Sequence, residues 1–132
     1  MNEFNKLLKS LIKGITSSDD LRELAKLLRV HIDGIYDISN FTYTGKGSYI
    51  ILLRQDMNIG HWVAVHDHEY FDPFGIGPPQ KIGATEYNRI QLQGDTFEYC
   101  GIYCLLWLYS KQRRRPDLME GFKNLDVDIR LI

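Results

Sequence analysis

Apolar side chains recur at helical spacing along the first thirty residues of the chain. Between residues 2 and 15 they fall three or four positions apart with lysines between them, which predicts an amphipathic helix. Residues 17–20 (SSDD) then offer helix-capping side chains, and Asp20 followed by Glu23 has the spacing of a capping box. Leucines at 21, 24, 27 and 28 form the next apolar stripe. We therefore expect a second helix that ends at about Arg29.

The middle of the chain changes to apolar, β-branched runs, which favour strands over helices. Strands are predicted at residues 48–54, 61–66, 69–72 and 89–92, with a turn at 67–68. Between residues 31 and 47 the sequence is rich in Asn, Asp, Gly, Ser and Tyr without a clear period, which predicts a loop. The prolines and glycines at 73–79 predict irregular structure after the third strand.

The last third of the chain begins with a run that is apolar on nearly every face. Residues 100–112 (CGIYCLLWLYSKQ) therefore predict a buried helix, and a short final helix is expected from residue 116 or 117 to about 124. A chain of 132 residues without repeats or a linker fits a single domain, 1–132. These elements predict an α+β fold in which a mostly antiparallel mixed sheet packs on a central buried helix with flanking helices.

The composition and net charge of the chain bear on whether it binds nucleic acid or a membrane. With 44% hydrophobic and 25% charged residues and a net charge of -1, the chain resembles an ordinary globular domain, which gives no general indication of nucleic-acid binding. The dense basic run KQRRR at 111–115 fits either the cationic end of a helix or a contact with nucleic acid. There is no apolar stretch of membrane-spanning length and no signal peptide, so we expect an intracellular reducing compartment and no membrane partner.

Both cysteines lie on the predicted buried helix, four residues apart, which is poor geometry for a disulfide between them. Cys100 begins this helix, and a helix amino terminus or a neighbouring imidazole favours the reactive thiolate form of a cysteine. Gly101 would let a substrate backbone approach and leave the first N–H groups of the helix open to a developing oxyanion. Gln93, seven residues before Cys100, carries an amide that can donate to the same oxyanion. Cys104 lies one turn further along, where we expect it in the core.

A general base is the second requirement of cysteine chemistry, and histidine suits it best. The four candidates are His31, His61, His66 and His68. His61 starts a predicted strand, where a side chain can face a cleft, whereas His66 and His68 flank a turn and are expected to be solvated. Asp72 ends the strand that follows the one begun by His61. Adjacent antiparallel strands bring the start of one beside the end of the next, so Asp72 can orient His61. Asp72 can equally cap the turn that begins at Pro73.

Zinc binding is an alternative use of the same side chains. Imidazole and carboxylate groups are common zinc ligands, and the candidates are His61, His66, His68 and Asp72. Their spacing matches no established zinc pattern, and the two cysteines do not form a C-x-x-C pair. We therefore expect no metal site.

Four short sequence words occur in a recognisable order: GHW at 60–62, DPFG at 72–75, QG at 93–94 and YCG at 99–101. In this order they resemble the adenovirus maturation protease (adenain-like) family, and the related ubiquitin-like-protein proteases share the same succession of His, acid, Gln and Cys. The resemblance covers most of the chain. It implies a single-domain cysteine protease fold.

The resemblance also implies a role for each residue. His61 corresponds to the general base, Asp72 to its orienting acid, Cys100 to the nucleophile and Gln93 to the oxyanion donor, while Trp62 corresponds to an aromatic ring beside the histidine. The adenovirus enzymes carry Glu where this chain has Asp72. Aspartate is the usual acid in the ubiquitin-like-protein branch.

The function implied is a cysteine endopeptidase that cleaves viral capsid precursors at small-residue, Gly-containing sites during virion maturation. The closest context is that of the small virophage and Polinton-type proteases, acting as a monomer in the host cytoplasm or virus factory and packaged in the virion. The adenovirus enzymes are longer, basic, and stimulated by DNA and a disulfide-tethered peptide; this shorter, slightly acidic chain gives no reason to expect any cofactor. Two alternatives stay open: an isopeptidase acting on diglycine tails, and a catalytically silent binding module on the same fold.

Overall fold

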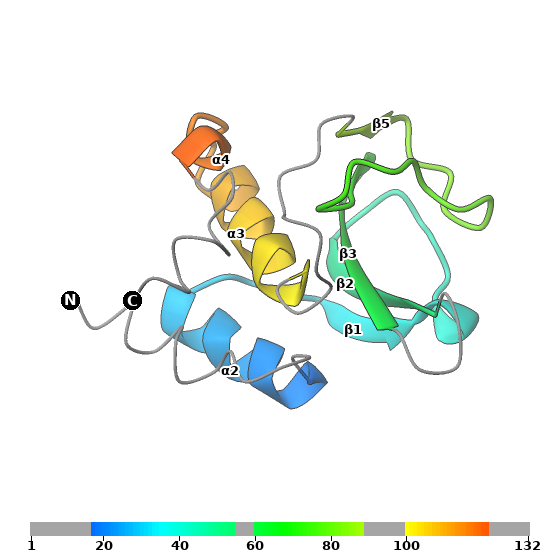
Figure 1. The fold of residues 1–132 in the computed structure, drawn as a ribbon, viewed down its shortest axis with the longest axis horizontal. Coiled ribbons are helices and arrows are strands. Elements are labelled where there is room, and N and C mark those ends of the chain that lie inside the picture. Colours follow the sequence, from blue (N-terminus) through cyan, green and yellow to red (C-terminus); the bar gives the residue numbers. More distant parts are fainter. Residues whose placement is uncertain (1–16, 55–59, 89–99, 122–132) are drawn as a thin grey trace.

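A five-stranded mixed sheet with helices against one face forms the described part of the chain (Figure 1). The structure is a computed structural model, and it describes residues 17–54, 60–88 and 100–121. The helix predicted at 2–15, the strand predicted at 89–92 and Gln93 all lie outside the described residues.

The strands lie in the sheet in the order in which they occur in the sequence. They are β1 (Gly34–Asp37), β2 (Ser48–Arg54), β3 (Gly60–His66), β4 (Glu69–Phe71) and β5 (Glu86–Tyr87). The central pairs β2–β3 and β3–β4 are antiparallel, as expected, but the outer pairs β1–β2 and β4–β5 are parallel. The predicted mixed sheet is thus confirmed, with as many parallel as antiparallel strand pairs among the described strands. The three strands predicted between residues 48 and 72 are confirmed, the last of them ending at Phe71.

The loop predicted at 31–47 is wrong in part, because it contains β1 and a 3₁₀ turn, Ile38–Asn40. Strand β1 is four residues long and pairs with β2 in parallel, from Gly34 opposite Tyr49 to Asp37 opposite Leu52. So short a strand shows no alternation in its sequence, and its stability depends on a partner more than ten residues away. The side chain of Asp37 then accepts a hydrogen bond from the Ser39 backbone N–H (3.1 Å) and starts the 3₁₀ turn.

Helix α2 (Ser18–Leu28) begins and ends close to the predicted positions. Its capping box is formed by Ser17 and Asp20, whose side chains each accept from the other's backbone N–H, at 3.1 Å and 3.3 Å. The expected box of Asp20 with Glu23 is therefore wrong, because Ser17 already satisfies the free N–H of the first turn. Arg29 ends the helix in the left-handed conformation (φ 56°).

Helix α3 (Cys100–Gln112) has the predicted bounds and is buried over most of its length. Together with α2 it covers one face of the sheet (Figure 1), where an apolar core forms around residues that include Leu21, Ile50, Trp62, Phe71 and Leu105. A second core on the other face contains Phe41, Ile51, Val63, Val65, Tyr70 and Ile82. Strand β3 contributes to both cores, and burial on two faces explains why its sequence does not alternate.

The basic run at 111–115 is largely occupied by contacts within the protein. Lys111 pairs with Glu69, and Arg115 pairs with Asp117 at 2.9 Å. Arg113 donates to the backbone carbonyl of Leu28 (2.9 Å) and so ties the end of α3 to the end of α2. These contacts favour the helix-end interpretation of the run.

Beyond α3 a short helix, α4 (Leu118–Gly121), occupies part of the segment predicted as the final helix. Within the three described ranges, no helix has both the length and the apolar character needed to cross a membrane.

Candidate active site

His61 and Asp72 meet at the end of the sheet where β3 begins and β4 finishes. His61 Nε2 lies 2.7 Å from Asp72 Oδ1, and the two side chains are 0% and 2% exposed. The β3–β4 pairing ends with Ala64 opposite Phe71. If this register is extended, Phe74 lies opposite His61. Asp72 then lies two residues before Phe74, in the diagonal position next to His61. The pairing of His61 with Asp72, inferred from an assumed hairpin, is thus confirmed.

Asp72 also caps the turn that follows it. Its Oδ1 atom, the same oxygen that contacts His61, accepts a hydrogen bond from the Phe74 backbone N–H at 2.8 Å, and its carbonyl accepts from the Gly75 N–H at 2.8 Å. Asp72 therefore both contacts His61 and caps the turn. The turn holds the carboxylate in the orientation that the histidine requires.

Cys100 is the first residue of α3 and is 1% exposed. Its Sγ atom accepts a hydrogen bond from the backbone N–H of Trp62, the residue after His61 in β3, at 3.2 Å. A helix amino terminus and a backbone donor to sulfur both favour a negatively charged sulfur. The main chain of β3 therefore carries the histidine and one donor to the thiol in consecutive residues.

The imidazole of His61 is buried and, besides Asp72, contacts one described aromatic ring. The ring of Phe74 packs against it, with centroids 5.1 Å apart and planes tilted by 41°. The resemblance assigns a ring beside the histidine to Trp62; the described contact is made by Phe74, and Trp62 contributes its backbone N–H to the thiol. Phe74 had no expected role, although it belongs to the DPFG word.

The pKa of His61 is raised from 6.5 to about 9. Burial, the largest influence, lowers it, but hydrogen bonds to Asp72 and Cys100 and the charges of both residues together outweigh burial. His61 is therefore protonated at neutral pH. Because Nε2 serves Asp72, Nδ1 is the ring nitrogen that can exchange a proton with Cys100.

Cys104 and Gly101 have structural roles in α3. Burial, together with the charges of Cys100 and Asp72, raises the pKa of the fully buried Cys104 thiol well above its usual value, which confirms Cys104 as a core residue. A Cβ atom on Gly101 would lie 2.8 Å from Leu21 Cδ2. The absence of a side chain at Gly101 thus allows α2 and α3 to approach, a packing role that the sequence did not predict.

Asn88 joins the site without any signal in the sequence. It follows β5, and its side chain bonds both backbone groups of Asp72: Oδ1 accepts from the Asp72 N–H at 2.9 Å and Nδ2 donates to the Asp72 carbonyl at 2.5 Å. A single asparagine sixteen residues from its partner matches no motif. Only the parallel pairing of β4 with β5, which the sequence did not predict, brings the two together.

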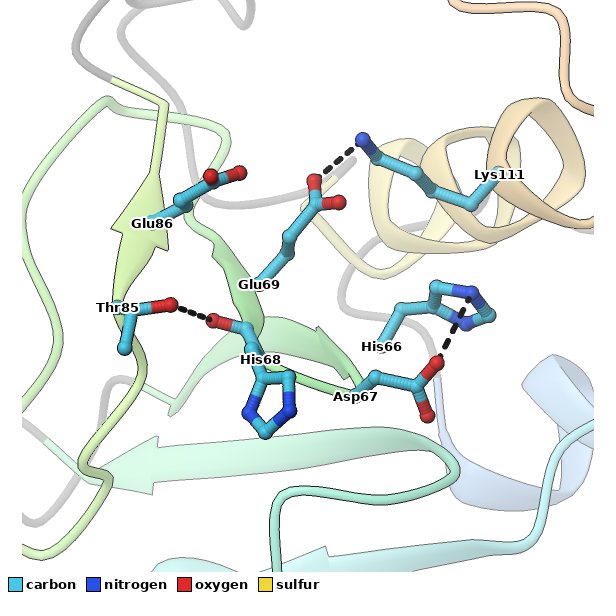
Figure 2. Close-up of a pocket in the computed structure, with 7 residues that line it drawn as sticks. All are labelled: His66, Asp67, His68, Glu69, Thr85, Glu86 and Lys111. Carbon is cyan, nitrogen blue, oxygen red and sulfur yellow. Dashed lines mark hydrogen bonds and ion pairs between the residues drawn. The ribbon is translucent and has the colours of Figure 1, made fainter.

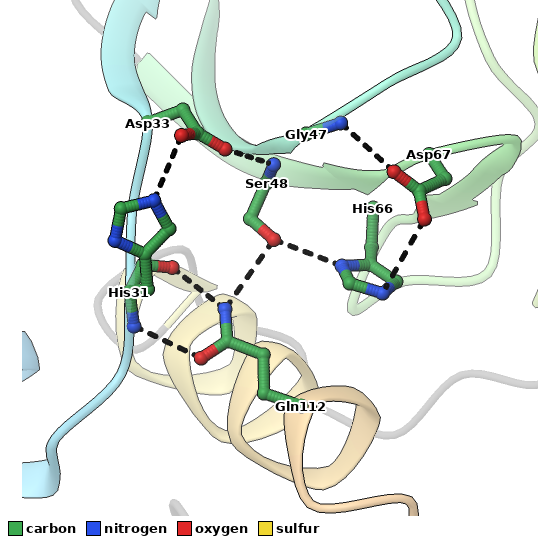
Figure 3. A network of polar contacts seen from close by, with 7 residues as sticks. All are labelled: His31, Asp33, Gly47, Ser48, His66, Asp67 and Gln112. Atoms are coloured by element: carbon green, nitrogen blue, oxygen red, sulfur yellow. Dashed lines mark hydrogen bonds and ion pairs between the residues drawn. The ribbon is translucent and has the colours of Figure 1, made fainter.

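Two of the other three histidines belong to a polar network that links the sheet to the end of α3 (Figure 3). His31 Nε2 lies 2.8 Å from Asp33 Oδ1, and His66 Nδ1 lies 2.8 Å from Ser48 Oγ. Gln112 donates to the Ser48 hydroxyl at 3.3 Å and to the His31 carbonyl at 2.6 Å. These hydrogen bonds stabilise the fold at the carboxyl-terminal end of α3, whereas Cys100 lies at its amino-terminal end.

His68 lies beside a cleft of about 430 Å³ at the same end of α3 (Figure 2). The cleft is lined by His66, Asp67, His68, Glu69, Thr85, Glu86 and Lys111. Lys111 and Glu69 pair across it, so its charges are partly neutralised. Among the residues that the structure describes, no three His, Cys, Asp or Glu side chains are grouped so that they could hold a metal ion.

No protein-family model matches the chain, and no curated protein sequence matches it.

Proposed function

We propose that this chain is a cysteine endopeptidase with the cysteine protease fold of the adenain-like family. Cys100 is its nucleophile, His61 its general acid and base, and Asp72 the acid that orients His61. One observation carries the proposal: a fully buried imidazole is hydrogen bonded to a carboxylate at 2.7 Å and interacts with a cysteine at the start of a helix. Burial disfavours the charged form of a histidine, and ionisable groups with strongly shifted pKa values cluster at functional sites.

The proposed reaction is acyl transfer. The Cys100 thiolate attacks the carbonyl carbon of the peptide and forms a C–S bond, and the carbonyl oxygen becomes an oxyanion. As the C–N bond breaks, protonated His61 gives its proton to the leaving amine. Water then attacks the thioester with His61 taking its proton, and the thiolate leaves as the carboxylic acid product forms.

The oxyanion needs donors at the amino terminus of α3. The backbone N–H of Cys100 is one candidate donor, because the first N–H groups of a helix have no partner within the helix. Gln93, which the resemblance assigns as the second donor, lies outside the described residues. Asp72 keeps the imidazolium in place by accepting from Nε2, which leaves Nδ1 for the reaction.

The enclosure of the site bears on the substrate. Cys100 is 1% exposed and His61 is 0% exposed, so there is little room for bulky groups beside Sγ. A scissile bond flanked by glycine presents the least bulk to such a site. We propose capsid precursor proteins cleaved at Gly-containing sites as the substrate class, in line with the resemblance.

Cleavage of a complex peptide mixture tests this function. The 132-residue chain and its Cys100→Ala variant are incubated in reducing buffer with peptides from a digested proteome, and new termini are identified by mass spectrometry. The proposal predicts cleavage by the native protein alone, next to glycine, and unaffected by a chelator. Cleavage confined to ubiquitin-like fusions would establish the isopeptidase alternative, and no Cys100-dependent cleavage of either substrate would favour a binding module.

A further inference from the structure

The backbone of Asp72 is hydrogen bonded like a strand residue although β4 has already ended. The β4–β5 pairing stops at Tyr70 opposite Tyr87, and β4 itself ends at Phe71. At the next position the side chain of Asn88 takes over, accepting from the Asp72 N–H at 2.9 Å and donating to the Asp72 carbonyl at 2.5 Å. A primary amide carries the same acceptor and donor as a peptide group. Asn88 thus takes the place of a strand neighbour, which no residue in the described ranges provides at this position.

The backbone position of Asp72 decides where its carboxylate lies. Aspartate has a single methylene between Cα and the carboxylate, one fewer than glutamate, so a shift of its main chain moves Oδ1 by nearly the same amount. That one oxygen must meet both His61 Nε2 at 2.7 Å and the Phe74 N–H at 2.8 Å. Asn88 holds the main chain together with the Gly75 N–H, which donates to the same carbonyl at 2.8 Å, and the Phe74 N–H holds the side chain.

We propose that Asn88 is a positioning residue for the His61–Asp72 pair, acting through the backbone of Asp72. Alanine at this position would remove the partner of the Asp72 N–H and one of the two donors to its carbonyl, which also accepts from the Gly75 N–H. The main chain would then hold the carboxylate less firmly on the imidazole. This inference rests on the proposed function for its effect on turnover. Its effect on the protonation of His61 does not depend on turnover.

The test compares Asn88→Ala and Asn88→Gln with the native chain and with Asn40→Ala. Asn40 is an exposed asparagine of the 3₁₀ turn and provides the same substitution away from the site. The ring nitrogens of His61 are titrated by NMR in the full-length chain, and kcat and KM are measured for any Cys100-dependent peptide cleavage. Thermal unfolding verifies that each variant is folded.

We expect the titration midpoint of His61 to fall from about 9 toward 6.5 in Asn88→Ala, while Asn40→Ala leaves it unchanged. The accompanying loss in kcat should be about 10- to 100-fold with KM little changed, by analogy with the removal of a group that orients a metal-ligating side chain. Asn88→Gln keeps both hydrogen-bonding groups but displaces them by one methylene. It should therefore show a smaller shift in the same direction, and it serves the test if the alanine variant does not fold.

A native midpoint of His61 in folded Asn88→Ala and Asn88→Gln would overturn the positioning role. A midpoint that falls as expected in a protein without Cys100-dependent cleavage would support the role of Asn88 and contradict the proposed function. The two conclusions are therefore separable.

Discussion

Asp72→Asn isolates the charge of the orienting carboxylate from its shape. The amide has the same size, and its oxygen can still accept from the Phe74 N–H, which donates to Asp72 at 2.8 Å in the native protein. What the substitution removes is the negative charge that lies 2.7 Å from His61 Nε2. We expect the site to keep its geometry and the imidazolium to lose most of its stabilisation.

The size of the effect follows from the pKa of His61. This pKa is about 9 against an ordinary value of 6.5, although burial acts to lower it. One pKa unit corresponds to about 1.4 kcal/mol, so the shift represents about 3 kcal/mol in favour of the protonated ring. Without the Asp72 charge, the pKa of His61 should fall well below 9, although the hydrogen bond and charge of Cys100 still act to raise it.

The assay is an NMR titration of the histidine ring nitrogens, in which the signal of His61 is assigned by its absence from His61→Gln. Asp67→Asn is the matched control, since Asp67 is a half-exposed carboxylate 3.8 Å from a different histidine, His66. In the proposed enzyme kcat should also fall by a factor on the order of 10⁴, as for a triad that loses the charge of its acid. A His61 midpoint that stays near 9 in Asp72→Asn would refute this reasoning, because another group would then have to hold the proton.

Three further outcomes are expected. Gly101→Ala should lower the free energy of unfolding in urea by about 1–2 kcal/mol, because its methyl group would lie 2.8 Å from the buried Leu21 Cδ2. This overpacking outweighs the gain in helix propensity. A more stable variant would contradict this packing. Cys104→Ala should cost about 1 kcal/mol in the same measurement and leave the alkylation rate of Cys100 unchanged, whereas slower alkylation would give Cys104 a chemical role. Folding raises the pKa of His61 from 6.5 to about 9, so its contribution to stability is complete below pH 6.5 and is lost as the pH rises through 9. The free energy of unfolding should fall over this range more steeply in the native protein than in His61→Gln, and equal slopes would argue against the shift.

Local patterns in the sequence were sufficient for the elements that carry the site. The apolar run of α3 and the β-branched runs of β2 and β3 predicted their bounds closely, because each is long and buried. Strand β1 was missed because four residues have too little pattern of their own, and their conformation depends on pairing with β2. The cap of α2 was misassigned because residues 17–20 offer several competing side chains.

The candidate site was predictable where it follows from strand adjacency. The hairpin of β3 and β4 was enough to bring His61 to Asp72, and the helix start was enough to single out Cys100. Asn88 could not be found in this way, because its contact depends on a parallel strand pair that the sequence does not indicate. The donor from Trp62 to the thiol is a main-chain group, which residue identity does not reveal.

The most direct measurement of the central claim is the rate of iodoacetamide alkylation at each cysteine as a function of pH. Peptide mass mapping separates Cys100 from Cys104, in the native protein and in His61→Ala. The account predicts fast labelling of Cys100 near neutral pH, much slower labelling of Cys104, and a loss of the difference in His61→Ala. Slow and equal labelling of the two cysteines, or a rate at Cys100 that is indifferent to His61, would contradict an activated cysteine–histidine pair.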